Sequence, residues 1–274
     1  MLFRILFGVL IFQGVVGGVF QMQAQVKVPV NAAQVQVRSP ALTHARTPAQ
    51  TQASKSNTSV YTHKVADPDG VGKVYMGREI AKVMSFDGAD WLERDYRQKE
   101  EKTLQAIQKL PITKNSIVAD IGAGTGYYTF KIAPKLSGGR IYAEEIQDEM
   151  LHYLANRKNQ LGLKNVEIVR GTDKSTGLAR SSVDVVLLVD VYHELLYPNE
   201  MLASVRESLK PCGQVVILEY RAEDKEVPIR NLHKMSAVQV NKEFSANGFK
   251  LISDQEFLPW QHFLVFQRVE TGPH

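Results

Sequence analysis

From Ser116 onward the sequence alternates short apolar runs with amphipathic segments, and this alternation constrains the fold more than any other feature. The apolar runs occupy residues 116–122, 140–145, 166–171, 183–190 and 214–220. The amphipathic segments, with apolar residues at helical spacing, occupy about 127–136, 148–161 and 198–209. Strands that alternate with helices in this way predict an α/β fold with a mainly parallel sheet covered on both faces.

The last part of the chain departs from this alternation. A helical segment near 237–247 precedes two apolar runs, 249–257 and 262–269, which are joined by a turn around Pro259. Two strands joined by a short turn favour an antiparallel hairpin, which we expect at an edge of the sheet.

Residues 61–114 are predicted to form a helical N-terminal extension. Apolar residues recur at helical spacing around Ile80–Met84 and again around Leu104–Leu110, and charges occupy the opposite faces. We expect two helical segments joined near Asp87–Gly88, with Pro111 after the second. Two interpretations stay open for this extension: a lid over a binding site, or helices that cover one edge of the sheet.

Residues 1–24 resemble a signal peptide. Arg4 precedes an apolar run over 5–20 that only Gln13 interrupts. As a helix this run would span about 24 Å, less than a hydrocarbon core of roughly 30 Å. The segment predicts export to the periplasm or the exterior. A retained membrane anchor, an organelle transit peptide and a cytoplasmic location are the alternatives.

Residues 25–60 are predicted to be a disordered linker. No aromatic residue occurs between Gln21 and Val60, and such a composition buries too little apolar surface to offset the entropy of ordering. With this linker, the expected organisation is a signal-like segment, a linker, the extension over 61–114 and a main domain over 115–270.

The positive charge of the chain is confined to its N-terminal part. The formal net charge is +4, yet six Lys and Arg and no acidic residue precede Asp67. The rest of the chain carries 27 Lys and Arg against 29 Asp and Glu. The main domain therefore gives no electrostatic reason to expect binding to nucleic acid. Membrane contact is expected only through the N-terminal segment, if that segment is retained, and the sequence carries no signal for an oligomeric state.

A glycine-rich segment, DIGAGTG at 120–126, lies directly after a predicted strand and before a predicted helix. Glycines permit positive φ angles and let the backbone approach a ligand closely, and the helix N-terminus adds a positive dipole. Glu145 ends the next predicted strand, 23 residues after Gly122, where a carboxylate can accept both ribose hydroxyls. A tight turn without a ligand is the alternative.

Four segments make the chain resemble the class I S-adenosylmethionine-dependent methyltransferases. In chain order they are VADIGAGTGYYT, IYAEEIQDEML, VDVVLLVDVYHEL and LKPCGQVVILEY. The resemblance is greatest to the group of small-molecule methyltransferases that includes the ubiquinone/menaquinone C-methyltransferases. It implies a doubly wound, Rossmann-like sheet of seven strands with the last strand antiparallel. It also implies S-adenosylmethionine as cofactor and methyl transfer to a small-molecule acceptor.

The resemblance further implies a role for individual residues. The methionine portion of the cofactor would be held by Asp120, Gly122, Gly124 and Gly126. Glu145 would bind the ribose and Ile146 would pack against the adenine. Asp173, with Thr172 beside it, would contact the adenine amino group, and Asp190 would lie beside the sulfonium. Two positions depart from the family pattern: Cys212 replaces a glycine, and Glu144 replaces an apolar residue before the ribose-binding acid.

Tyr192 and His193 follow the fourth predicted strand, at the sheet edge where ligands bind in such folds. Methyl transfer requires a base only when the acceptor must lose a proton, and an unperturbed histidine has a pKa of ~6.5. These two residues are therefore candidate catalytic residues. The alternative is that His193 packs or caps the start of the next helix.

The polar loop 221–235 follows the fifth predicted strand and would overhang an acceptor site, unless it is only a solvated loop. No metal site is expected, because His193 and His233 are distant in sequence and Cys212 is the only cysteine.

Two other functions stay open. An NAD(P)-dependent oxidoreductase is disfavoured by Tyr127, which stands where a dinucleotide fingerprint needs its third glycine. A non-catalytic cofactor-binding protein on the same fold is suggested by the signal-like segment, because S-adenosylmethionine is made in the cytoplasm.

Overall fold

The computed structural model describes residues 59–270. The signal-like segment over 1–24 and nearly all of the linker expected over 25–60 lie outside the described residues. Within residues 59–270, none of the helices has the length and apolar character needed to cross a membrane.

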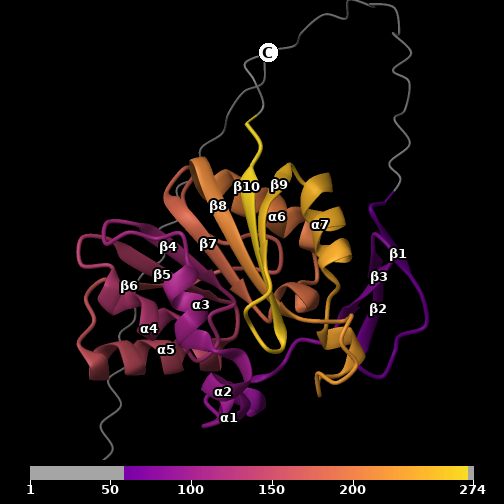
Figure 1. The fold of residues 1–274 in the computed structure, drawn as a ribbon, viewed down its shortest axis with the longest axis horizontal. Coiled ribbons are helices and arrows are strands. Elements are labelled where there is room, and N and C mark those ends of the chain that lie inside the picture. The colour runs from indigo at the N-terminus through magenta and orange to yellow at the C-terminus, as the bar shows by residue number, and fades with distance from the viewer. Residues whose placement is uncertain (1–58, 271–274) are drawn as a thin grey trace, which may run out of the picture. The chain divides into compact units, whose positions relative to one another are not determined.

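The main sheet has seven strands in the order β6-β5-β4-β7-β8-β10-β9 (Figure 1). Their bounds are β4 (Ile117–Ile121), β5 (Arg140–Glu145), β6 (Val166–Arg170), β7 (Val183–Val189), β8 (Leu209–Tyr220), β9 (Phe249–Gln255) and β10 (Gln261–Arg268). The pairs formed among β4, β5, β6, β7 and β8 are parallel, whereas β10 runs antiparallel to both β8 and β9. The predicted seven-stranded sheet with an antiparallel last strand is therefore confirmed, as is the predicted hairpin.

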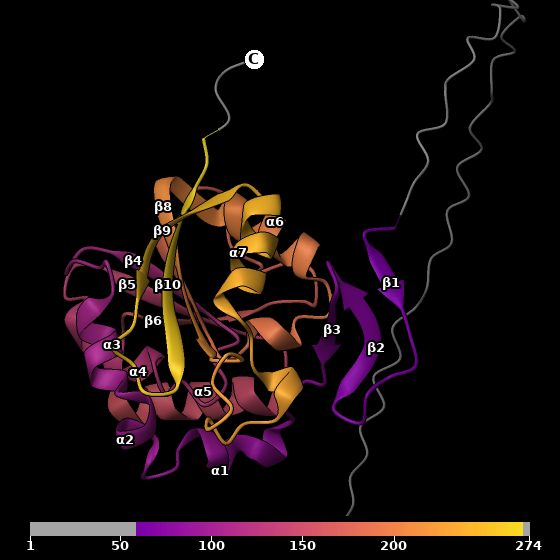
Figure 2. The same ribbon diagram turned by 45° about the vertical axis from the view of Figure 1, so that its right-hand side comes forward.

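Helices cover both faces of this sheet, as the views in Figures 1 and 2 show. One core packs α3 (Thr103–Lys109), α4 (Thr129–Ile132) and α5 (Asp148–Leu161) against the sheet. The other core packs α6 (Pro198–Ser208) and α7 (Ala237–Ala246) against the opposite face. In the second core, the ring of Phe244 stacks on that of Phe266 with centroids 4.4 Å apart. Burial on both faces explains why the strand sequences are almost continuously apolar.

The first part of the extension over 61–114 is not helical, and this prediction is wrong. Residues 61–81 form a small antiparallel sheet of β1 (Tyr61–His63), β2 (Gly70–Tyr75) and β3 (Arg78–Ala81). A two-residue turn at Met76–Gly77, with φ angles of 50° and 99°, joins β2 to β3. Two consecutive positive φ angles are typical of the tight hairpin turns that match strand twist. The turn therefore overrides the helical spacing of the apolar residues around Ile80.

The second part of the extension is helical, as predicted. It contains the short helical turn Phe86–Gly88, α1 (Ala89–Leu92), α2 (Arg97–Glu101) and α3.

Arg78 fastens the small sheet to the rest of the described domain. Its Nε and Nη2 atoms donate to the carboxylate of Glu243 at 2.8 and 3.0 Å. Its Nη1 atom donates to the backbone oxygen of His193 at 3.0 Å. Arg78 and Glu243 are both largely buried, and a bidentate arginine–carboxylate pair fixes orientation as well as distance. The small sheet therefore positions the segment that follows β7.

The single cysteine lies near the amino end of β8. Pairing between β7 and β8 shifts in register here, because Val183 pairs with Leu209 whereas Val185 pairs with Gln214. The intervening residues include Cys212, which is exposed and has a φ angle of 60°. The candidate functional site lies at the Tyr220 end of β8. The excursion is at the opposite end of the strand.

Candidate functional site

The glycine loop joins β4 to the segment that leads into α4, and it has the backbone conformation that the sequence predicts. The φ angles of Gly122, Gly124 and Gly126 are 65°, 55° and 78°. A Cβ atom on Gly122 would lie 2.4 Å from Cγ2 of Val191, so the loop passes directly against the segment that follows β7. Gly126 instead faces the core, because its Cβ would lie 2.4 Å from the Phe130 ring.

The amides of this loop hold two carboxylates. Gly122 N donates to Glu144 Oε2 at 3.1 Å, and Gly124 N donates to Glu145 Oε2 at 3.0 Å. Ala123 N donates to the backbone oxygen of Glu144 at 2.9 Å. The loop amides therefore fix the acidic end of β5, rather than all remaining available to a ligand.

Three carboxyl groups gather around the loop. Asp120 is buried and accepts a hydrogen bond from Thr129 Oγ1 at 2.6 Å. Burial raises the pKa of Asp120 to about 6, against the hydrogen bonds from Thr129. Burial also raises the pKa of Glu144 to about 8, and the neighbouring carboxylates of Glu145 and Asp120 add to this effect. With these pKa values Glu144 is protonated near neutral pH, whereas Asp120 contributes a buried negative charge that favours a cationic ligand.

One cleft brings together almost all the residues to which the resemblance assigns a cofactor role. The lining includes Asp120, Gly122, Gly124, Glu145, Ile146, Thr172, Asp173 and Asp190. Gly126 is not among the lining residues; it shapes the turn through its contact with Phe130. Glu144 lines the cleft beside Glu145, so both carboxylates of this pair border the same space.

Asp190 occupies a strained position directly after β7. Its φ angle is 51°, and both of its carboxylate oxygens accept hydrogen bonds from Gln261 Nε2, at 2.9 and 2.8 Å. Burial, together with Glu101 and Glu219, raises the pKa of Asp190 well above its usual range. Such backbone strain is often concentrated at ligand-binding positions.

A second cavity adjoins the cleft. Five residues line both spaces, namely Met84, Leu92, Arg97, Asp190 and Glu194. The second cavity is further bordered by Trp91 and by the segment Pro228–Arg230 of the loop that follows β8. His233 of the same loop also lines the second cavity, so this part of the polar loop 221–235 borders a cavity.

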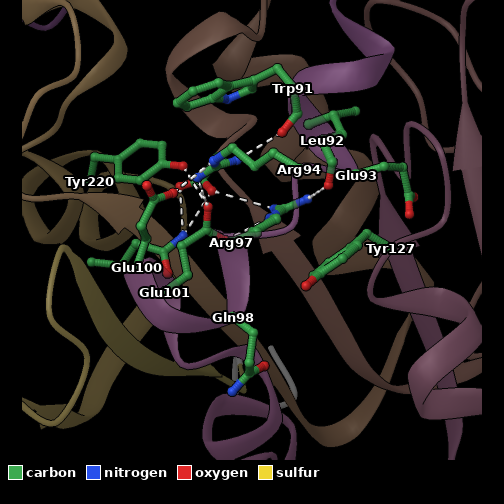
Figure 3. Close-up of polar contacts among 12 residues, drawn as sticks. Trp91, Leu92, Glu93, Arg94, Arg97, Gln98, Glu100, Glu101, Tyr127 and Tyr220 are labelled. Atoms are coloured by element: carbon green, nitrogen blue, oxygen red, sulfur yellow. Dashed lines mark hydrogen bonds and ion pairs between the residues drawn. The ribbon is translucent and has the colours of Figure 1, made fainter.

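Arg97 is a site residue that the sequence analysis missed. Figure 3 shows it on α2, where Nε donates to Glu101 Oε2 and Nη1 donates to the backbone oxygen of Leu92, both at 2.8 Å. Within residues 59–270, Nη2 has no hydrogen-bond acceptor in range, and it lies 3.8 Å from Oδ2 of Asp190. The guanidinium thus retains one donor where the two cavities meet.

Glu101 organises the surroundings of Arg97 (Figure 3). Its buried carboxylate also accepts hydrogen bonds from Arg94 Nη2 at 2.7 Å and from the Tyr220 hydroxyl at 2.8 Å. Since Tyr220 ends β8, this network ties α2 to the main sheet. The charged sequence of α2 is typical of a solvent-exposed helix and gives no signal for such a network. Only the burial of Glu101 in the structure reveals it.

Tyr192 and His193, the candidate catalytic residues, point into different surroundings. Tyr192 is fully buried in the second core, and its hydroxyl donates to Glu243 Oε2 at 2.7 Å. It does not line either cavity. His193 lines the second cavity, and its Nδ1 lies 2.6 Å from Oε2 of the buried Glu219.

The structure brings His193 and His233 together in spite of their sequence separation. Nε2 of His193 lies 3.2 Å from Nδ1 of His233, and both atoms lie close to Oε1 of Glu194. Burial opposes a charge on His193, but the carboxylates of Glu219 and Glu194 outweigh it and raise its pKa to about 10. Without another cation, His193 therefore holds a proton at neutral pH. The sequence separation of the two histidines, from which we expected no shared site, is bridged by the adjacent strands β7 and β8.

Comparison with known proteins agrees with this arrangement. Residues 119–215 match the family described as a methyltransferase domain. Residues 119–215 of the chain therefore form a methyltransferase domain. An S-adenosylmethionine-dependent methyltransferase from Aquifex aeolicus has the same fold, with a TM-score of 0.65 at 21% identity over 68% of this chain and 100% of that one.

Two curated relatives are also similar to this methyltransferase. A tRNA U34 carboxymethyltransferase from Desulfotalea psychrophila is 32% identical over 126 residues, which are 45% of this chain. The methyltransferase spans only 38% of the length of that relative. The uncharacterized methyltransferase YdaC from Bacillus subtilis is 25% identical over 158 residues, which cover 57% of this chain and 84% of that protein.

S-adenosylmethionine is the cofactor that this family implies, and the cleft of the methyltransferase fits it. Carboxylates at the end of β5 are suited to accept hydrogen bonds from ribose hydroxyls. The Ile146 side chain is 45% exposed and offers an apolar surface to a base. The remaining Arg97 donor suits a carboxylate, and the acidic cluster around Asp120 suits a cation.

Proposed function

We propose that the methyltransferase binds S-adenosylmethionine in the glycine-loop cleft and transfers its methyl group to an acceptor in the second cavity. The observation that carries this proposal is the junction of the two spaces. Asp190, Arg97 and Glu194 line both of them, so a ligand in one space reaches a ligand in the other at these residues.

Each end of the cofactor has matching groups in the cleft. Glu144 and Glu145, fixed by the loop amides, would hold the ribose. Arg97 would bind the methionine carboxylate through Nη2, and Asp190 would lie near the cationic end. Asp190 is held in place by two hydrogen bonds from Gln261, so it needs little rearrangement to bind a ligand.

The cofactor supplies a methyl group that is already activated by a sulfonium. The work left to the protein is to align the acceptor with that group and to exclude water. Leu92 and Met84 from the extension border both spaces, which places apolar side chains where water would otherwise enter. We infer a structural role for Tyr192, which is buried against Glu243.

The acceptor that fits the second cavity best is a small molecule with an aromatic or apolar body and a polar or anionic group. Trp91, Tyr220 and Ile229 offer apolar and aromatic surface, and Arg230 offers positive charge. A second candidate is a base in RNA, which the similarity to a tRNA carboxymethyltransferase over 126 residues favours.

Calorimetric titration of the full chain tests the cofactor. We expect binding of S-adenosylmethionine and S-adenosylhomocysteine, and no binding of NADH. Binding of NADH alone would establish the oxidoreductase alternative. Cofactor binding without methyl incorporation into any tested acceptor would favour a non-catalytic binding protein.

The pair Arg97→Gln and Arg94→Gln tests the carboxylate assignment. Both arginines donate to Glu101, but only Arg97 lines the cavities. Losing one charge-assisted hydrogen bond of about 1.5–3 kcal/mol should weaken cofactor binding at least about tenfold in Arg97→Gln. Arg94→Gln should keep wild-type affinity, and equal losses in both variants would contradict the assignment.

Transfer of a labelled methyl group distinguishes the acceptors. The full chain would be incubated with methyl-labelled S-adenosylmethionine and either a small-molecule extract or total tRNA. We expect label in the small-molecule fraction. Label in tRNA alone would replace the small-molecule acceptor by the second candidate.

A further inference from the structure

Two histidines and a glutamate from different parts of the chain converge on one point beside the second cavity. His193 and Glu194 lie in the helical turn Tyr192–Glu194 after β7, and His233 ends the helical turn Asn231–His233 after β8. The three side chains are between 2% and 13% exposed. All three line the second cavity.

The distances among the three ligand atoms are nearly equal. His193 Nε2 and His233 Nδ1 are 3.2 Å apart. Glu194 Oε1 lies 3.6 Å from the first and 3.3 Å from the second. Ligands bonded at about 2.1 Å to a tetrahedral ion are separated by about 3.4 Å, whereas adjacent ligands of an octahedral ion are separated by about 3.0 Å. The triangle therefore matches one face of a tetrahedron.

A second set of contacts holds two of the three ligands, His193 and Glu194, in this orientation. The buried carboxylate of Glu219 lies 2.6 Å from His193 Nδ1, which turns Nε2 toward the cluster. Met84 N donates to Glu194 Oε2 at 3.2 Å, which leaves Oε1 for the cluster. Arg78 fixes the backbone of His193. A carboxylate behind the ligating histidine is the usual partner of a metal-bound imidazole.

We propose that His193, Glu194 and His233 bind a zinc ion whose fourth coordination position faces the second cavity. Two imidazole nitrogens and one carboxylate oxygen form a ligand set that suits Zn²⁺, and three protein ligands leave one position open. The proposal goes beyond methyl transfer, since the binding of zinc does not depend on the cofactor. If the proposed function holds, the open position would bind an oxygen, nitrogen or sulfur atom of the acceptor.

Metal binding is measured on the full chain, produced without a polyhistidine tag, stripped with a chelator and dialysed. We expect one equivalent of Zn²⁺ per chain by calorimetry and elemental analysis. Replacement by Co²⁺ should give the intense visible absorption of a tetrahedral site. A chain that binds no Zn²⁺, and holds only an ion pair among these side chains, would overturn the proposal.

The variants His233→Ala and Glu194→Gln remove one ligand each. Both should weaken Zn²⁺ binding by at least about 100-fold, and Glu219→Gln should weaken it by about 10–100-fold. The matched control is His262→Ala, because His262 is also a buried histidine paired with a carboxylate, Glu223, at 2.9 Å. It should bind Zn²⁺ like the wild type.

Cofactor affinity separates this proposal from the preceding one. His233 does not line the cofactor cleft, so His233→Ala should bind S-adenosylmethionine normally while it loses Zn²⁺. Unchanged Zn²⁺ affinity in both ligand variants would overturn the zinc site, whatever the result for the cofactor. If His233→Ala does not fold, Glu194→Gln and Glu219→Gln, which preserve side-chain volume, decide the question.

Discussion

Single residues determine how closely the glycine loop approaches the segment after β7. Gly122 and Gly162 have nearly the same φ angle, 65° and 63°, but their surroundings differ. A Cβ on Gly122 would meet Val191 at 2.4 Å, whereas a Cβ on Gly162 would have no atom of residues 59–270 within 4 Å. Substituting alanine at Gly162 therefore measures backbone strain alone, whereas substituting alanine at Gly122 measures strain and the contact with Val191 together.

The first prediction follows from this pair. Gly162→Ala should cost about 1 kcal/mol of unfolding free energy, the usual penalty for a left-handed alanine. Gly122→Ala should cost about 2–4 kcal/mol, because Val191 must also move. Urea unfolding monitored by circular dichroism measures both. Equal losses would show that the contact with Val191 is unimportant.

Glu144 makes stability depend on pH. Burial, supported by the neighbouring carboxylates, raises its pKa from 4.5 to about 8 in the folded chain. The folded state therefore retains a proton that the unfolded state releases. This contribution to stability is complete below pH 4.5 and is lost as the pH rises through 8.

In Glu144→Gln this loss should disappear. The unfolding free energy of the wild type should fall relative to that of the variant between pH 4.5 and 8, by on the order of 5 kcal/mol. Urea titrations at several pH values measure the difference. Parallel pH profiles for the two proteins would contradict the assignment of a raised pKa to Glu144.

At the scale of elements, one buried carboxylate links α2 to the main sheet. Glu101 accepts hydrogen bonds from Arg94, Arg97 and Tyr220. Removing its charge leaves two arginines without their buried partner. Among the residues that the structure describes, the neighbouring Glu100 accepts from Arg94 alone; it is partly exposed, so it provides a matched comparison.

Glu101→Gln should lower the unfolding free energy by about 3–5 kcal/mol, as expected for a broken buried ion pair. Glu100→Gln should lower it by less than about 1 kcal/mol. Amide hydrogen exchange over residues 89–101 should rise in the first variant alone. Unchanged exchange in Glu101→Gln would mean that other contacts hold α2.

The sequence predicts the elements of the main sheet well and those of the small sheet poorly. The predicted strand over 140–145 and helix over 148–161 coincide with β5 and α5, because both have strong periodicity. In the small sheet, Lys73 and Glu79 are buried, so charged residues interrupt the apolar alternation of β2 and β3. Glu79 is tolerated inside because Asp67 N, Gly72 N and Lys64 surround its carboxylate.

At the scale of the whole molecule, the order of strands in the sheet determines which loops lie side by side, and the sequence pattern does not predict this order. The sequence predicts that β7 and β8 are strands, but only the strand order in the structure shows that they are neighbours. Their adjacency places the loops after them side by side and brings His193 to His233. The same order gathers the ends of β4, β5 and β7 around the cofactor cleft. Local motifs thus predict the cleft, whereas the histidine cluster depends on long-range topology.

The position of Cys212 has a practical consequence. The thiol is exposed at one end of β8, and Tyr220, which borders the second cavity, ends the same strand. At about 3.3 Å per residue, the regularly paired part of β8 from Gln214 to Tyr220 alone spans roughly 20 Å. A fluorophore attached to this unique sulfhydryl would therefore not obstruct the cavities. Energy transfer between it and a fluorescent ligand would report on ligand binding.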